Sequence, residues 1–346
     1  MKTLFRIFAL LGMMMAAASA GITEGEIGGA KYMIAAPEKW QGKLVLIAHG
    51  YRNADSPLDA GFDTKDAFST GMLERGWAIA STSYRRNGWI VEDAILDLRA
   101  LSDHVAKEHG KIDRCLLVGS SMGGLIGTLI AEGALDHVDG VVAIGAYLGN
   151  ESRDGANGSL SFKPTAPILY LTNETELNHP QNYRKQEGGA KTALWEVKRP
   201  GHCNVSDIER LNAMLAVNDW VDGKAIEKER DGTVAPPVRE STATKVDGGL
   251  SGKITVVSES WGNLTTDLVG KDLETLGLKL GDKAVVKNGE KSLAVSVVRY
   301  WSEAKEGEAA IYVTPKGWVG IVTNGGRAVD SLGVKAGDTV VLGKAE

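Results

Sequence analysis

The sequence of 346 residues predicts an α/β fold, in which a mostly parallel sheet carries helices on both faces, followed by a small β-rich, barrel-like domain. Two observations support the first domain. Apolar runs of strand length alternate with segments of helical periodicity through the first two thirds of the chain. Those runs are continuously apolar, which is typical of strands buried on both faces. The third observation is a change beyond about Leu250, where short strand-like runs alternate with turns.

The elements of the first domain follow one another in a regular order. Ile90, Ala94 and Leu98 recur at helical spacing, and the same apolar face continues through Leu101 and Val105. Similar patterns predict helices over residues 62–76, 89–109, 122–134 and 206–221. Strands are predicted over residues 43–50, 77–84, 113–120, 138–147, 166–173 and 192–199.

A polar stretch separates the two domains. Residues 226–249 contain two prolines and no apolar periodicity, so we interpret them as a linker. The predicted domains are therefore a catalytic domain over residues 21–225 and a β-rich domain over residues 250–346.

The first twenty residues have the pattern of a cleaved secretory signal. Lys2 and Arg6 precede an apolar run that ends in Ala18-Ser19-Ala20. A membrane anchor helix is the alternative, but the run is shorter than the roughly 20 residues that a span needs. We expect a mature protein that starts near Gly21 and is periplasmic or secreted, with no membrane anchor.

Composition excludes some classes of partner. The net charge is −5 and the isoelectric point is near 5.8, so nothing favours binding to nucleic acid or to an anionic membrane. The sequence contains no cluster of metal-ligand residues, and we expect neither a metal nor a cofactor. The expected partner is an ester or peptide substrate.

The motif Gly119-Ser120-Ser121-Met122-Gly123 fits G-x-S-x-G with Ser121 at its centre. A predicted strand precedes it and a predicted helix follows, which is the context of a nucleophile elbow. Larger side chains at positions 119 and 123 would collide with neighbouring backbone in so tight a turn. We therefore predict Ser121 as the nucleophile and Ser120 as a structural hydroxyl.

A serine nucleophile needs a base, an orienting carboxylate and donors for the oxyanion. His202 lies in a loop after the last predicted strand and is the expected base; His179 is a weaker rival, and His104, His109 and His137 are expected at the surface. The carboxylate should come from the loop after strand 166–173, where Glu176 is preferred to Glu174, with Asp207 as a further alternative. Expected oxyanion donors are the backbone N–H groups of Met122 and Tyr51, the latter in the loop His49-Gly50-Tyr51, where His49 is expected to be structural.

Residues 26–224 resemble an α/β-hydrolase. The resemblance rests on HG after an early strand, TSYRRNGW at 82–89, GSSMGG at the elbow, and PGH. Tyr84 to Gly124 is similar to secreted bacterial esterases and to prolyl-oligopeptidase-like hydrolases, which implies acyl transfer to water through an acyl-serine. In such hydrolases Gly-x-x-Asp often follows the strand before the histidine loop. Aligning Asn173 with that glycine gives Glu176, a glutamate where aspartate is commoner.

The two cysteines are predicted to be free. Cys115 begins the strand that ends at Ser121, whereas Cys203 adjoins His202. Because His202 must reach Ser121, Cys203 must lie close to Ser121 as well. At about 3.3 Å per residue, Cys115 lies roughly 13–20 Å from Ser121, so it is too far from Cys203 for a disulfide.

The substrate pocket is expected among loops at the carboxyl ends of the strands. Candidate pocket residues are Tyr84, Trp89, Tyr147 and Arg52; Arg85 and Arg86 lie nearby, and each could equally be scaffold. Only about twenty residues (148–165) join the two strands between which many relatives insert a cap, so the site should be open unless the second domain covers it.

Residues 250–346 resemble the C-terminal β-barrel of S-adenosylmethionine hydroxide adenosyltransferases. ITVVSESWGNLTTDL and GIVTNGGRAVDSLGVKAGDTVVL carry the resemblance, which implies Trp261, Asn263 and Asn324 as counterparts of adenosine-binding residues. The N-terminal half of that family's active site is absent, and Ser258-Glu259-Ser260 departs from its aspartate pattern, so the adenosyltransferase reaction is not carried over. A structural or docking barrel is the alternative.

Together these features predict an exported serine hydrolase of carboxylic esters. A serine peptidase and a non-catalytic ligand-binding protein on a hydrolase fold are the alternatives.

Overall fold

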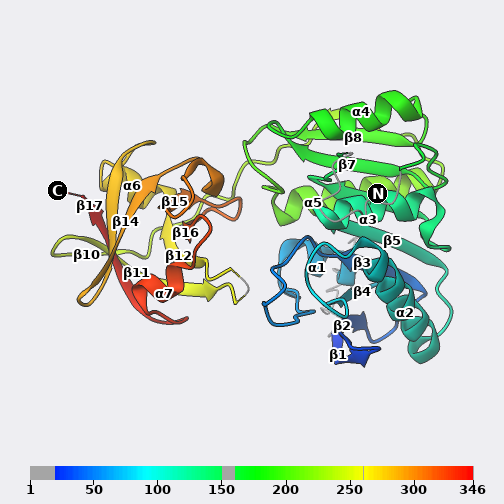
Figure 1. Cartoon of the computed structure of the whole chain (residues 1–346), viewed down its shortest axis with the longest axis horizontal. Coiled ribbons are helices and arrows are strands. Elements are labelled where there is room, and N and C mark those ends of the chain that lie inside the picture. The colour runs from blue at the N-terminus through cyan, green and yellow to red at the C-terminus, as the bar shows by residue number, and fades with distance from the viewer. Residues whose placement is uncertain (1–19, 150–159, 260, 346) are drawn as a thin grey trace, which may run out of the picture.

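A computed structural model describes residues 20–149, 160–259 and 261–345. These residues form two domains, each built around its own sheet (Figure 1). The leader predicted over residues 1–20 lies outside the described residues, except for Ala20. No helix in the described ranges has both the length and the apolar character needed to cross a membrane.

The first domain contains a nine-stranded sheet in the order β1-β2-β4-β3-β5-β6-β7-β8-β9. The hairpin β1–β2 and the pair β2–β4 are antiparallel, and every pair from β4–β3 to β8–β9 is parallel. The predicted mostly parallel sheet is confirmed. Its strands are β1 (Ala20–Ile27), β2 (Ala30–Pro37), β3 (Lys43–Ala48), β4 (Trp77–Thr82), β5 (Arg114–Ser120), β6 (Gly140–Ile144), β7 (Ile168–Asn173), β8 (Thr192–Val197) and β9 (Glu229–Asp231).

Helices cover both faces of this sheet, as predicted. Helices α2 (Val91–His109) and α3 (Met122–Leu129) share one apolar cluster with the sheet, whereas α1 (Ala67–Glu74) and α5 (Asp207–Val221) share the cluster on the other face. Helix α3 continues into a short π-helix, η1 (Ile130–Ala134). The sequence did not predict α4 (Asn178–Glu187), because this helix is polar and buries only Pro180 and Tyr183.

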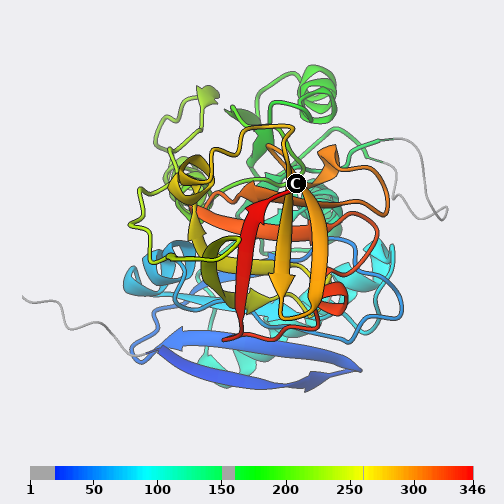
Figure 2. The same ribbon diagram turned by 90° about the vertical axis from the view of Figure 1, so that its left-hand side faces the viewer.

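The second domain is a closed barrel (Figure 2). Its eight strands follow the order β10-β11-β12-β16-β15-β14-β13-β17; β17 also pairs with β11, which closes a ring of all except β10. A large apolar cluster fills the barrel. Its elements are β10 (Thr244–Val246), β11 (Gly249–Val257), β12 (Leu264–Val269), α6 (Gly270–Thr275), β13 (Lys283–Asn288), β14 (Lys291–Val297), η2 (Trp301–Glu303), β15 (Ala309–Val313), β16 (Trp318–Thr323), α7 (Ala328–Leu332) and β17 (Thr339–Lys344).

The segment interpreted as a linker is more ordered than expected. Its strand β9 extends the first sheet, and its strand β10 pairs with the barrel. The Val234 N–H donates to Glu209 at 2.7 Å, and the Arg239 guanidinium donates to the Lys316 carbonyl at 2.6 Å. Only residues 235–238 separate these two anchors. Strands of three residues carry too little periodicity to be seen in a polar sequence.

The buried carboxylate of Glu209 fixes the start of α5. Ser206 caps this helix and forms a reciprocal capping box with Glu209. The same carboxylate, with a fully buried side chain, accepts from Arg199 at 2.5 Å and from the Val234 N–H at 2.7 Å. It therefore ties the helix, the end of β8 and the linker together.

We expect Glu209→Ala to lower the free energy of unfolding by about 3–5 kcal/mol, because the charge of Arg199 would keep only carbonyl acceptors and no carboxylate in a largely buried site. Denaturant unfolding measures this difference. Asp219→Ala on the same helix is the matched control: Asp219 pairs with Lys224 at the surface, and such pairs contribute roughly 1 kcal/mol or less. Equal losses for the two variants would contradict the assigned role of Glu209.

Candidate active site

Three side chains predicted from the sequence meet at one edge of the first sheet. Ser121 follows β5, Glu176 follows β7 and His202 follows β8. The Ser121 Oγ lies 2.7 Å from the His202 Nε2, and the His202 Nδ1 is hydrogen-bonded to the Glu176 carboxylate. The His202 side chain is 39% exposed and that of Glu176 21%, so molecules from solvent can reach the group.

The turn at Ser121 is strained in the way the sequence predicts. Ser121 has φ 58° and ψ −117°, a conformation that L-residues seldom adopt, between the end of β5 and the start of α3. A Cβ at Gly119 would lie 2.1 Å from the Gly123 carbonyl oxygen, and one at Gly123 would lie 2.0 Å from the Ala48 oxygen. Any side chain at either position would therefore force the turn apart.

The structure separates the three candidate acids. Only Glu176 contacts His202; Glu174 is exposed, and Asp207 pairs with Lys316 at 2.9 Å. Gly145 makes room for this contact, because a Cβ there would lie 3.0 Å from the Glu176 carboxylate and 2.8 Å from the Cys203 sulfur.

Side chains from other segments hold the backbone around His202. Four consecutive N–H groups, of residues 201–204, each donate to a side chain. In chain order the acceptors are Thr175 at 3.0 Å, Tyr300 at 2.8 Å, Glu176 at 3.4 Å and Asn173 at 2.7 Å. Asn173 ends β7, Thr175 and Glu176 belong to the loop that follows it, and Tyr300 belongs to the barrel. Sequence reasoning used Asn173 only as the counterpart of the motif glycine that positions Glu176, and it did not single out Thr175 or Tyr300, which lie in no recognisable motif.

Two backbone N–H groups beside Ser121 are free to bind an oxyanion. Within the described parts of the chain, neither Met122 nor Tyr51 donates its N–H to a protein acceptor. The loop before Tyr51 passes directly against the elbow, since a Cβ at Gly50 would lie 3.2 Å from the Ser121 Cβ. Met122 follows Ser121 directly in the chain, and the loop that leads to Tyr51 lies against Ser121.

His49 and Tyr84 form a support under this loop. Their rings stack with centroids 4.0 Å apart, and the Tyr84 hydroxyl donates to the His49 carbonyl at 3.3 Å. Burial, with a smaller effect from Arg52, lowers the pKa of His49 to about 4, so the ring is neutral. Tyr84 is fully buried, so its prediction as a pocket residue is wrong: its strand-end loop turns into the core.

The other candidate pocket residues divide into two groups. The rings of Trp89 and His179 both contact Tyr147, with centroids 5.7 Å and 5.1 Å from it, and the Tyr147 N–H lies 3.4 Å from the Ser121 carbonyl. This aromatic group therefore adjoins the elbow. Arg52 is half-buried and donates to the Asp59 carbonyl. Arg85 and Arg86 form ion pairs with Asp97 and Asp93, which makes them scaffold.

Electrostatics favour the charged form of His202. The Cys203 sulfur and the Glu176 carboxylate raise the pKa of His202 above its ordinary value, against the opposing effect of burial. The sulfur lies 3.8 Å from the Nε2 and 3.4 Å from the Ile144 carbonyl. The imidazolium that forms when the ring takes a proton is therefore stabilised.

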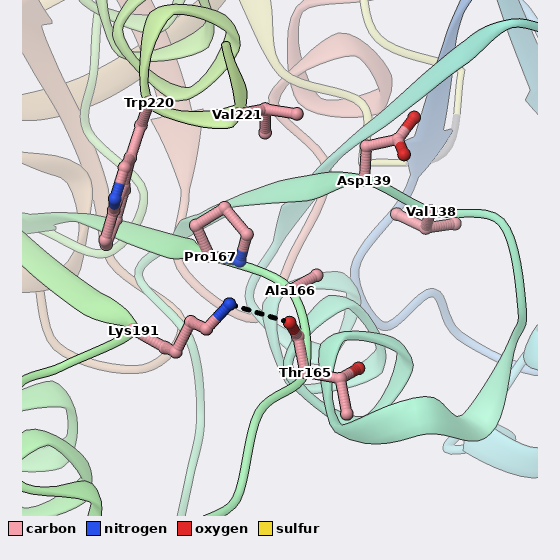
Figure 3. Close-up of a pocket in the computed structure, with 8 residues that line it drawn as sticks. All are labelled: Val138, Asp139, Thr165, Ala166, Pro167, Lys191, Trp220 and Val221. Atoms are coloured by element: carbon pink, nitrogen blue, oxygen red, sulfur yellow. Dashed lines mark hydrogen bonds between the residues drawn. The ribbon is translucent and has the colours of Figure 1, made fainter. Parts of the chain in front are cut away.

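A separate pocket of about 370 Å³ lies at the opposite edge of the sheet (Figure 3). Its lining comes from the segments that enter β6, β7 and β8, and from the end of α5. There the Lys191 ammonium donates to the Thr165 carbonyl at 3.1 Å. This pocket cannot hold a substrate that Ser121 attacks.

Among the described residues, no group of three or more His, Cys, Asp or Glu side chains could hold a metal ion.

Two family models match separate parts of the chain. Residues 81–186 match the serine aminopeptidase S33 family, and residues 252–341 match the C-terminal domain of S-adenosylmethionine hydroxide adenosyltransferases. The first domain therefore has the α/β-hydrolase fold, and the second has the barrel of that C-terminal domain. Of the barrel residues suggested by the resemblance, Asn324 donates to the Ala304 carbonyl at 2.7 Å. This hydrogen bond joins the loop after β16 to the loop after η2.

Similar proteins include hydrolases of several kinds. The chain is 32% identical over 125 residues to an o-phthalyl amidase of Xanthobacter agilis, an alignment of 34% of this chain and 25% of the amidase. A Pyrococcus furiosus esterase has 14% identity and a TM-score of 0.40, covering 63% of this chain and 93% of its own. The acylaminoacyl peptidase of Pyrococcus horikoshii has 12% identity and a TM-score of 0.47, and the match covers 60% of this chain and 42% of the peptidase. The chain thus spans only a quarter of the amidase's length.

The cysteines are free, as predicted: Cys115 is buried and Cys203 half-buried. Burial raises the pKa of the Cys115 thiol above its usual range.

We expect a thiol reagent such as DTNB to modify one cysteine in the native protein and two in denaturant. Cys203→Ala should abolish the native reaction, whereas Cys115→Ala should preserve it; the reverse pattern would contradict this placement.

Proposed function

We propose that the protein is a serine hydrolase that cleaves carboxylic esters through an acyl-serine intermediate. The observation that supports this most is the unbroken hydrogen-bond chain from Ser121 through His202 to Glu176. The strained turn at Ser121 and the two unpaired N–H groups beside it support the same reaction. A ligand-binding protein would have no need for this alignment.

Each residue has one role in the proposed reaction. The His202 Nε2 takes the proton of Ser121 as the Oγ attacks the substrate carbonyl carbon. The Glu176 carboxylate keeps the proton of the ring on Nδ1 and stabilises the imidazolium. The N–H groups of Met122 and Tyr51 bind the oxygen that becomes negative.

The leaving group departs with the proton that His202 received. A water molecule then gives a proton to the same nitrogen and attacks the acyl carbon, and the acid product leaves as the Ser121 hydroxyl is restored. The group formed by Trp89, Tyr147 and His179 offers an aromatic surface beside the elbow for an acyl or leaving group.

Amide cleavage is the second candidate. It is favoured by the relative named as an o-phthalyl amidase, and the same residues can act on either bond. An amide leaving group is a poor one until it is protonated, so amide cleavage depends more on proton donation by His202.

We also propose that the protein is exported. The support is the charged, apolar and Ala-x-Ala pattern of residues 1–20. Cleavage after Ala20 would leave β1 almost complete, since this strand spans Ala20–Ile27.

A fluorophosphonate probe tests the nucleophile. The unmodified protein should label and should hydrolyse p-nitrophenyl esters, and Ser121→Ala should lose labelling and reduce kcat by at least about 10⁴-fold. Ser120→Ala is the matched control and should retain both. An unmodified protein that does not label would favour ligand binding without catalysis. Matched p-nitrophenyl esters and p-nitroanilides of the same acyl groups then decide between ester and amide substrates.

The pH profile tests the base. His202 must be neutral to accept the proton, so kcat/KM should rise with pH through the raised pKa of His202, above about 6.5. Because the Cys203 sulfur contributes to this raised pKa, Cys203→Ala should shift the acidic limb to lower pH. Cys115→Ala, remote from the ring, should leave the limb in place. A limb that Cys203→Ala does not move would exclude this effect of the sulfur.

A further inference from the structure

The barrel contacts the first domain at the segment that carries His202. The Tyr300 hydroxyl oxygen accepts the His202 N–H at 2.8 Å, and the Lys316 ammonium pairs with Asp207 at 2.9 Å. Asp207 is the first residue of α5, five positions beyond His202. Two separate parts of the barrel thus hold one short stretch of the first domain. In Figure 1 the barrel lies beside that domain on the side of α1 and α5.

Backbone geometry around His202 makes this contact important. Gly201 has φ +145° and Cys203 has φ +54°, so His202 lies between two residues in left-handed conformations. No helix or strand includes residues 198–206. The peptide that precedes His202 is therefore oriented by the hydrogen bonds of its neighbours to side chains, and its own N–H depends on Tyr300.

Tyr300 is well suited to accept this hydrogen bond. Although it lies between β14 and η2 rather than in a strand, only 7% of its surface is exposed, and its ring contacts Trp301 with centroids 5.4 Å apart. Burial raises the pKa of its phenol, so the group stays neutral and its oxygen accepts without placing a charge beside the imidazolium.

We propose that Tyr300 of the barrel is a positioning residue for His202, so that the catalytic unit of this hydrolase includes both domains. Tyr300 touches no reacting atom; it holds the backbone from which the imidazole reaches both Ser121 and Glu176. Without that acceptor, the His202 N–H must find water and the ring samples more orientations. This inference rests on the proposed function.

The test is Tyr300→Phe in the full chain, which removes one oxygen atom. We expect kcat for a p-nitrophenyl ester to fall about tenfold, within a range of roughly 5- to 100-fold, with KM changed less than about twofold. The acidic limb of the pH profile should also move, because the ring no longer rests in one position against Glu176. If Tyr300 only stabilised the fold, Tyr300→Phe would change the melting temperature and leave the pH profile of the folded enzyme unchanged.

Tyr312→Phe is the matched control. Tyr312 lies on β15 of the same barrel, and it makes no contact with His202 among the described residues. It should keep kcat within about twofold of the unmodified protein. If Tyr300→Phe retains as much activity as Tyr312→Phe while the unmodified protein labels at Ser121, the inference is wrong and the proposed function stands. If the unmodified protein neither labels nor hydrolyses any ester or anilide, the proposed function itself fails.

Hydrogen exchange on the unmodified protein gives a measurement that does not depend on the variant's folding. The His202 amide should exchange at least about tenfold more slowly than an exposed loop amide such as that of Val238, which is 98% exposed. Exchange of His202 as fast as that of Val238 would show that the barrel does not hold this amide in solution, and would overturn the inference.

Discussion

The two hydrogen bonds of the His202 ring can form only because the loops after β5, β7 and β8 leave the same edge of one sheet. Parallel pairing of these strands places all their carboxyl ends together. Ser121 and Glu176, which lie 81 and 26 positions from His202 in the chain, are thereby brought to within reach of its imidazole. A single antiparallel strand among them would place one loop at the other edge, where the remote pocket lies.

Sequence reasoning succeeded where chemistry is local or where chain order is fixed by the fold. Ser121 was predictable because the elbow, its glycines and its flanking elements lie within a dozen residues. The sequence could also place Glu176 and His202 next to one another in space, because each follows a buried strand. The error at Tyr84 has the opposite cause: a loop position says which edge a residue lies at, not whether its side chain turns outward or into the core.

The contact of Tyr300 with His202 lay beyond any such reasoning. It joins residues 98 positions apart in two domains, and neither residue's neighbours in sequence point to the other. The barrel's resemblance to a domain with another role was no guide, because a fold conserves its apolar interior while its loops take up new contacts. Here the informative loop is the one between β14 and β15, which contacts the first domain through Tyr300.

The shortness of the free tether between the domains has an energetic consequence. With anchors at Val234 and Arg239, the chain between them includes the consecutive prolines Pro236 and Pro237, which restrict its conformations. A stiff connection of this length keeps the two surfaces at a local concentration in the millimolar range or above. A handful of polar contacts, each too weak to assemble separate molecules, is then enough to keep the barrel seated.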